Sequence, residues 1–159
     1  MEFITDRTQE DVDRVKYLAE KLLSGTNTDE ELEEFLTSLK GALNYSDIHR
    51  IASNINRIAT LINVPHNLYV YDDDERDLDS YPIPRVAYFR ELLDHVSRIR
   101  NSHYYLSTTP RTPSMPLNTF QKINDIEKIL EDAYDAFLRN QASLFFCGDN
   151  IYSGEYMLL

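Results

Sequence analysis

The feature that most constrains the fold is a stripe of aliphatic residues between positions 48 and 62. Its members recur every three or four residues: Ile48, Ile51, Ala52, Ile55, Ile58, Ala59 and Ile62. This spacing places them on one face of an α-helix, which must bury that face against other elements. Asn44 with Asp47 three residues later predicts the start of the helix, and Pro65 stops its continuation. The segment is therefore expected to be a core helix.

Two helices are predicted before this one. The first opens with a capping pair at Thr8 and Asp11 and stops at Gly25, and the second opens with a stronger pair at Thr28 and Glu31 and ends at residues 40–41. Together they are expected to form a helical hairpin. The residues predicted to face inward are Val12, Val15, Ala19 and Leu22 in the first helix and Leu32, Phe35, Leu36 and Leu39 in the second.

Two more helices follow, one from Pro84 to Arg100 and one that begins near Asn118. Alternating spacings of three and four are typical of helices that cross at shallow angles in bundles. The predicted fold class is therefore mainly α, a compact antiparallel bundle of about five helices within residues 1–143. The apolar positions of these two helices are Val86, Phe89, Leu93, Val96, Ile99, Ile123, Ile126, Leu130, Ala133 and Phe137.

Helical periodicity fails in three places. Residues 63–84 contain a dense acidic run, and residues 101–117 contain three prolines among Ser and Thr, so both are predicted to be irregular surface loops. Residues 144–159 are apolar, aromatic and interrupted by glycine, which favours a short C-terminal β-hairpin. Because an isolated hairpin is marginal in water, it is expected either to pack on its own bundle or to pair with another subunit. For the second case, the predicted partner-binding residues are Phe145, Phe146, Gly148, Ile151, Tyr152, Gly154, Tyr156 and Met157.

Several polar residues lie beside the apolar stripes: Asn54, Asn56, Asn124, Asp125 and Glu127. A buried amide in such a position can fix the register between helices. The alternative is simple exposure, and one or two of these residues are expected to bond backbone groups of the loops.

Charge and composition restrict the classes of molecule that the protein can bind. The chain has 27 acidic and 16 basic residues and a formal net charge of −11, which disfavours binding to nucleic acid and to anionic membranes. No apolar run approaches the roughly 18 to 20 residues needed to cross a bilayer. The lone Cys147 and the N-terminal sequence favour a reducing cytoplasm unless the chain leaves as part of an assembly.

Catalytic signals are sparse, and neither a cofactor nor a catalytic residue is predicted. The four glycines do not have phosphate-loop spacing. His49, His66, His95 and His103 are scattered along the chain, and their spacing predicts no metal site. The most enzyme-like alternative is an all-α carboxylate-metal nucleotide pyrophosphohydrolase whose acids hold Mg²⁺. Its ligands would be Glu30, Glu31, Glu34, Glu91 and Asp94, although the same acids also suit an ordinary solvated helix face.

Four segments, taken together and in order, resemble small proteins and domains encoded among the tail genes of phages and prophages of Firmicutes. They are residues 4–13, 39–51, 124–130 and 148–155. The resemblance implies a structural component of a virion or tail-like particle, near the baseplate or in a tail appendage, and not an enzyme. Such a protein would assemble in the host cytoplasm and then reside in the particle, as a homo-oligomer or bound to another tail protein.

The composition and the helical pattern agree with this expectation, since a helical body with an apolar tail suits an assembly module. A weaker alternative is a regulatory protein whose acidic surface mimics nucleic acid. Binding to a basic host protein, weakened by salt, would be its signature.

Overall fold

The computed structural model describes residues 1–37, 39–70, 85–102 and 105–142, which form helices and connecting segments without a β-strand. This confirms the mainly α prediction for the described part of the chain. The predicted β-hairpin at residues 144–159 lies outside it. The helices are α1 (Gln9–Ser24), α2 (Asp29–Thr37), α3 (Tyr45–Leu61), α4 (Val86–Asn101) and α5 (Phe120–Ala142).

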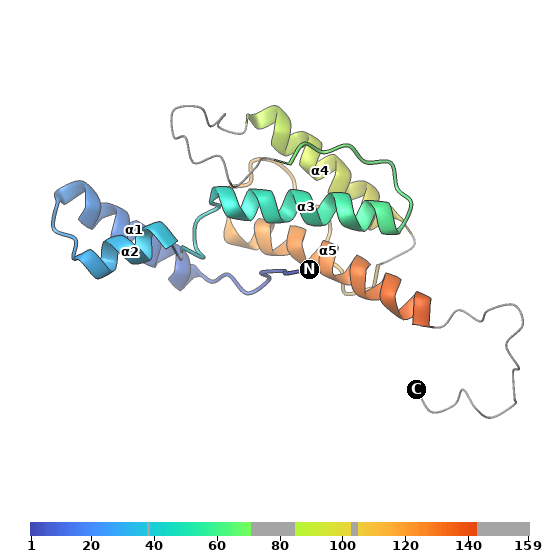
Figure 1. Cartoon of the computed structure of the whole chain (residues 1–159), viewed down its shortest axis with the longest axis horizontal. Coiled ribbons are helices and arrows are strands. Elements are labelled where there is room, and N and C mark those ends of the chain that lie inside the picture. The colour runs from blue at the N-terminus through green and yellow to red at the C-terminus, as the bar shows by residue number, and fades with distance from the viewer. Residues whose placement is uncertain (38, 71–84, 103–104, 143–159) are drawn as a thin grey trace, which may run out of the picture.

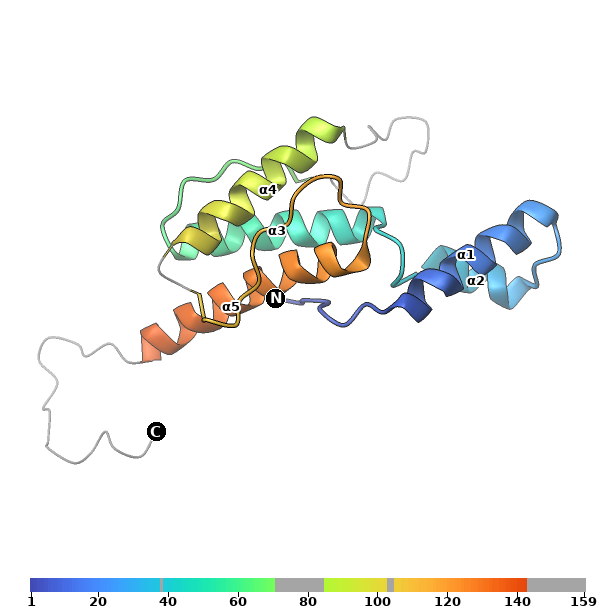
Figure 2. The same cartoon turned by 180° about the vertical axis from the view of Figure 1, so that it is seen from behind.

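The helices divide into a three-helix body and a two-helix extension (Figure 1). In the body, α3, α4 and α5 each pack against the other two, and α1 packs on α2. The view from behind shows the same arrangement, with α1 and α2 side by side at one end of the body (Figure 2). The described part of the chain is therefore elongated, with α1 and α2 beside a three-helix body rather than inside one compact bundle.

The aliphatic stripe of α3 is buried as predicted, since its residues from Ile48 to Ala59 are each at most 7% exposed. They meet the predicted inward residues of the other two body helices: Leu93, Val96 and Ile99 of α4 and Ile123, Ile126, Leu130 and Ala133 of α5. Fully burying each large aliphatic side chain contributes about 1.5 to 3 kcal/mol, so this seam is the main source of stability.

The predicted helix starts are also confirmed. Thr8 and Asn44 each form a capping box with the aspartate three residues later. Thr28 and Glu31 exchange the equivalent pair of hydrogen bonds at the start of α2. Gly25 closes α1 in the left-handed conformation, at φ 65°, which glycine adopts without steric cost.

The predicted antiparallel packing is wrong for the body. Figure 1 shows α3, α4 and α5 running in the same direction, each beginning at the end nearer to α1 and α2. Arg50 near the start of α3 contacts Glu127 near the start of α5, which fits parallel helices. Only α1 and α2 form the expected antiparallel pair.

The lengths of the connections explain this difference. The 17 residues of α3 span about 26 Å, a distance that about eight extended residues can cover. The 24 residues between α3 and α4 and the 18 between α4 and α5 are therefore long enough to return the chain to its starting end. Antiparallel neighbours usually need connections of only about two to eight residues.

Both return connections contribute to the core, which the prediction of surface loops missed. Leu68 is only 3% exposed, and its carbonyl accepts a hydrogen bond from Asn56 of α3. In the second connection Thr109 is buried, while Met115 and Leu117 pack against the core. Of the described helices, none combines the length and the apolar character that crossing a bilayer requires.

Candidate protein-interaction surface

The α1–α2 hairpin is held together by ion pairs along one side. Arg14 donates two hydrogen bonds to Glu34, at 2.9 and 2.5 Å, and Lys21 binds Glu31 at 2.6 Å. The ring of Tyr17 lies beneath both cations. Arg14 holds the pKa of Glu34 below its usual value, and Lys21 does the same for Glu31. These pairs define what we call the ionic side of the hairpin.

The opposite side of the hairpin is apolar. Val12, Val15, Ala19 and Leu23 follow helical spacing along α1, and Leu32 and Leu36 do so along α2. Because the helices are antiparallel and the ionic residues point to one side of their contact line, these six residues point to the other side. We call this set the apolar face.

The apolar face is incompletely covered. Leu23 is 89% exposed and Leu36 is 72% exposed, while Val12, Val15, Ala19 and Leu32 are half-buried. Leu18, between the two helices, is the one fully buried apolar residue among the described residues of the hairpin, and it does not belong to the main core. Two helices alone can shield only the line along which they touch. None of the predicted inward residues of α1 and α2 belongs to the main core, and Leu22 and Leu36 are exposed, so the prediction that these stripes are buried in a five-helix bundle is wrong.

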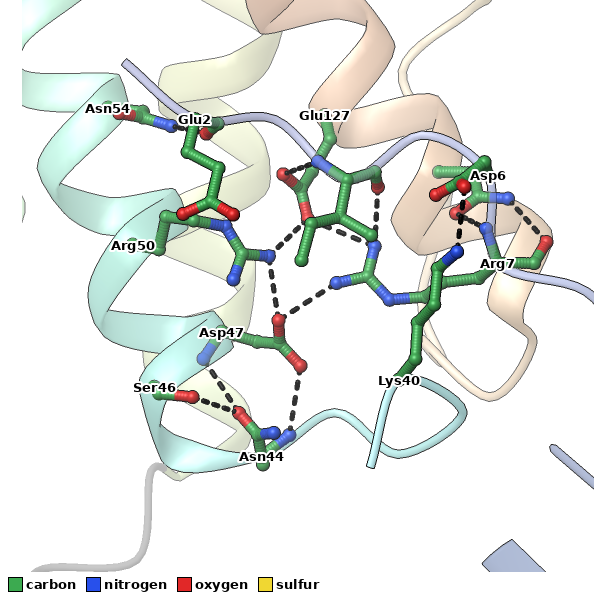
Figure 3. A network of polar contacts seen from close by, with 12 residues as sticks. Glu2, Asp6, Arg7, Lys40, Asn44, Ser46, Asp47, Arg50, Asn54 and Glu127 are labelled. Atoms are coloured by element: carbon green, nitrogen blue, oxygen red, sulfur yellow. Dashed lines mark hydrogen bonds and ion pairs between the residues drawn. The ribbon is translucent and has the colours of Figure 1, made fainter. Parts of the chain in front are cut away.

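The hairpin has a rigid base because the segment that enters α1 is fixed to the body by buried ion pairs (Figure 3). Arg7, whose side chain is 2% exposed, binds Asp47 of α3 at 2.9 Å and Glu127 of α5 at 3.0 Å. Arg50 binds the same two carboxylates at 2.6 and 2.7 Å. Two cations thus balance two anions, which is the condition under which buried charges are tolerated.

Electrostatics strengthen this arrangement. Burial alone would lower the pKa of Arg50, but the hydrogen bonds and charges of Glu127 and Asp47 outweigh it and raise that pKa. Glu127 also accepts a hydrogen bond from the backbone N–H of Ile4 at 2.8 Å. The network therefore holds the main chain as well as the side chains.

Amides complete the attachment, as predicted for the polar residues beside the stripes. Asn54 donates to the carbonyl of Glu2 at 2.8 Å. Asn124 donates to the carbonyl of Arg7 at 2.9 Å and accepts from its N–H at 3.3 Å. Residues 2–7 are thereby fixed between α3 and α5, and they fix the direction in which α1 leaves the body.

The exit from the hairpin is equally restricted. A Cβ atom added to Gly41 would lie 2.2 Å from the carbonyl oxygen of Asp11, so the backbones approach as only glycine allows. Lys40 pairs with Asp6 at 2.7 Å beside this contact. A cavity of about 190 Å³ remains at the base, with Arg7, Leu43 and Phe120 among its lining residues.

The carboxylates proposed as metal ligands in the pyrophosphohydrolase alternative lie in different parts of the structure. Glu31 and Glu34 are engaged by the cations of α1, whereas Glu91 and Asp94 line a cavity of about 310 Å³ beside α4. That cavity also brings together His66 and His95. Among the described residues, no group of three or more His, Cys, Asp and Glu side chains is arranged to hold a metal ion.

The predicted partner-binding residues of the tail lie outside the described residues, so their role stays a prediction. They are Phe145, Phe146, Gly148, Ile151, Tyr152, Gly154, Tyr156 and Met157. The sequence does not predict the apolar face as a contact surface, because the spacing of five of its residues, all but Leu23, predicts burial in the bundle core.

No protein-family model matches the chain, and neither a curated protein nor a solved structure matches it. The functional proposal therefore depends on the geometry and the sequence of this chain.

Proposed function

We propose that the protein is a non-enzymatic structural or assembly protein of a phage or phage-tail-like particle. It acts through protein–protein contacts as a tail, baseplate or appendage component. It is made in the host cytoplasm and is carried in the particle after assembly. Its partners are further copies of itself, another tail protein, or both.

The observation that carries this proposal is the exposed apolar face on a rigidly based hairpin. Exposed large apolar residues that share one face mark contact sites more often than scattered ones do. The buried ion pairs of Arg7 and the close approach at Gly41 hold this face in one orientation. A pre-oriented surface lowers the entropic cost of association, which suits an assembly protein. The assignment to a phage or phage-tail-like particle rests on the resemblance to phage tail-gene products, which residues 4–13, 39–51, 124–130 and 148–155 carry.

Particle composition tests the proposal. Tail-like particles purified by density gradient from producing cells should contain the chain in a fixed ratio to the major tail proteins. Mass spectrometry with labelled reference peptides measures that ratio. A chain found only in the soluble, particle-free fractions would refute the particle assignment.

The contribution of the tail is tested separately. Light scattering should show a discrete oligomer for the full chain and a monomer after deletion of residues 144–159, with unchanged helicity by circular dichroism. A truncated protein that assembles as the full chain does would remove the predicted role of Phe145, Tyr152 and their neighbours.

A further inference from the structure

The hairpin carries a disproportionate share of the negative charge. Residues 9–37 contain nine acidic and three basic side chains, which leaves a charge of −6 out of the total of −11. All three cations are already engaged within the hairpin, because Arg14 binds Glu34, Lys16 binds Asp13 and Lys21 binds Glu31. The net charge of −6 already includes these three cations.

The acids flank the apolar face. On α2, Asp29 lies three residues before Leu32, and Glu33 lies three residues before Leu36, along the edge of the face. On α1, the exposed Glu20 lies three residues before Leu23, and Lys16 on the same edge is paired with Asp13. An apolar strip with an acidic border is complementary to an apolar stripe with basic flanks.

A second copy of the hairpin does not have this chemistry. It would bring another charge of −6 to within the screening distance of about 8 to 10 Å, where like charges oppose association. A basic helix would reduce the repulsion and would also cover the exposed leucines. Charge therefore favours a basic partner helix over a second copy of the hairpin as the occupant of the apolar face.

We propose that the apolar face docks an amphipathic helix of a partner protein, with an apolar stripe flanked by Lys and Arg. That helix lies along the apolar face and completes a three-helix bundle with α1 and α2. The inference rests on the proposed function, because it names the chemistry of a partner in assembly. The apolar contacts supply affinity, and the charges supply specificity and speed of association.

The test uses two synthetic peptides of 16 residues, the length of α1. Both carry leucine at helical spacing, and they differ only in having lysine or glutamate at the flanking positions. Each is labelled, and its binding to the full-length protein is followed by fluorescence anisotropy. The lysine peptide should bind at least tenfold more tightly than the glutamate peptide, and about 1 M salt, at which the Debye length is about 3 Å, should weaken that binding.

Variants locate the binding. Leu23→Ser with Leu36→Ser removes the two most exposed residues of the face, and Leu61→Ser with Leu138→Ser is the matched control on the body, where both leucines are exposed. The hairpin variant should lose at least tenfold in affinity for the lysine peptide, and the control variant should keep it. All four sites are exposed, so circular dichroism should show both variants folded.

Three results would overturn the inference: no binding of the lysine peptide, equal binding of both peptides, or equal binding by the hairpin variant and the control. A dimer of the full-length protein that the hairpin variant alone dissolves would assign the face to a second copy. That result rejects the basic helix while it supports an assembly role. Absence of the chain from purified particles would refute the proposed function even where the lysine peptide binds as expected.

Discussion

Glu127 provides the most demanding test of how the hairpin is attached. Its side chain is fully buried, and its two oxygens accept from Arg7, Arg50 and the backbone of Ile4. Glu127→Gln keeps the shape of the side chain but removes its charge. Arg7 and Arg50 donate to one oxygen and Ile4 to the other, so the NH2 group of the amide meets either one donor or two, depending on how it is turned.

The expected cost follows from the charge balance. The native cluster pairs two cations with two anions, and the variant leaves one buried positive charge without a counter-ion. Breaking a buried ion pair from one side costs about 3 to 5 kcal/mol. The amide retains part of the hydrogen bonding, so a loss of about 3 kcal/mol in the free energy of unfolding is expected, equivalent to a fall in Tm of about 6 to 12 °C for a chain of this size.

Urea unfolding followed by circular dichroism measures this loss. The control is Glu131→Gln on the same helix, because Glu131 pairs with Lys128 near the surface. A surface pair contributes at most about 1 kcal/mol. A cost below about 1 kcal/mol for Glu127→Gln, or equal costs for both variants, would refute the argument that this network fixes the base of the hairpin.

Three further changes test other contacts. Gly41→Ala forces a Cβ against the backbone of α1 and should lower the free energy of unfolding by about 2 kcal/mol or more, as measured by thermal unfolding. Gly25→Ala has open space around it and should lower it by about 1 kcal/mol; a larger loss for Gly25→Ala would contradict the close packing at Gly41. Thr109→Val removes a 2.6 Å hydrogen bond to the buried carboxylate of Asp132 and should cost about 1 to 3 kcal/mol in urea, and a neutral result would show that water replaces it. Burial lowers the pKa of His95, so the folded state resists protonation and the free energy of unfolding should fall as the pH drops through the ordinary value of 6.5. His95→Gln should remove the contribution of His95 to this fall between about pH 7 and 5, and identical pH profiles for the two proteins would contradict the argument.

The sequence was sufficient for the helices because their signals are local. Capping pairs at Thr8, Thr28 and Asn44, the stop at Gly25 and the stripe of α3 depend on residues a few positions apart. The backbone bonds of Asn54, Asn56 and Asn124 were predictable in kind, because an amide beside an apolar stripe needs a partner.

The direction of the body helices and the exposure of the hairpin were not predicted, because both depend on distant parts of the chain. The sequence signal for parallel body helices is the length of their connections, 24 and 18 residues. The apolar stripes of α1 and α2 predicted burial but could not say what would cover them. Arg7 gave no signal, since its partners Asp47 and Glu127 are 40 and 120 positions away.

The most direct test of the account is the incorporation of hairpin variants into particles. Cells that produce the particle would carry either the Leu23→Ser and Leu36→Ser variant or the Leu61→Ser and Leu138→Ser control in place of the natural chain. The account predicts that the hairpin variant is lost from purified particles while the control remains at the natural ratio. Incorporation of the hairpin variant at the same ratio as the control would contradict the assignment of the apolar face as the contact surface.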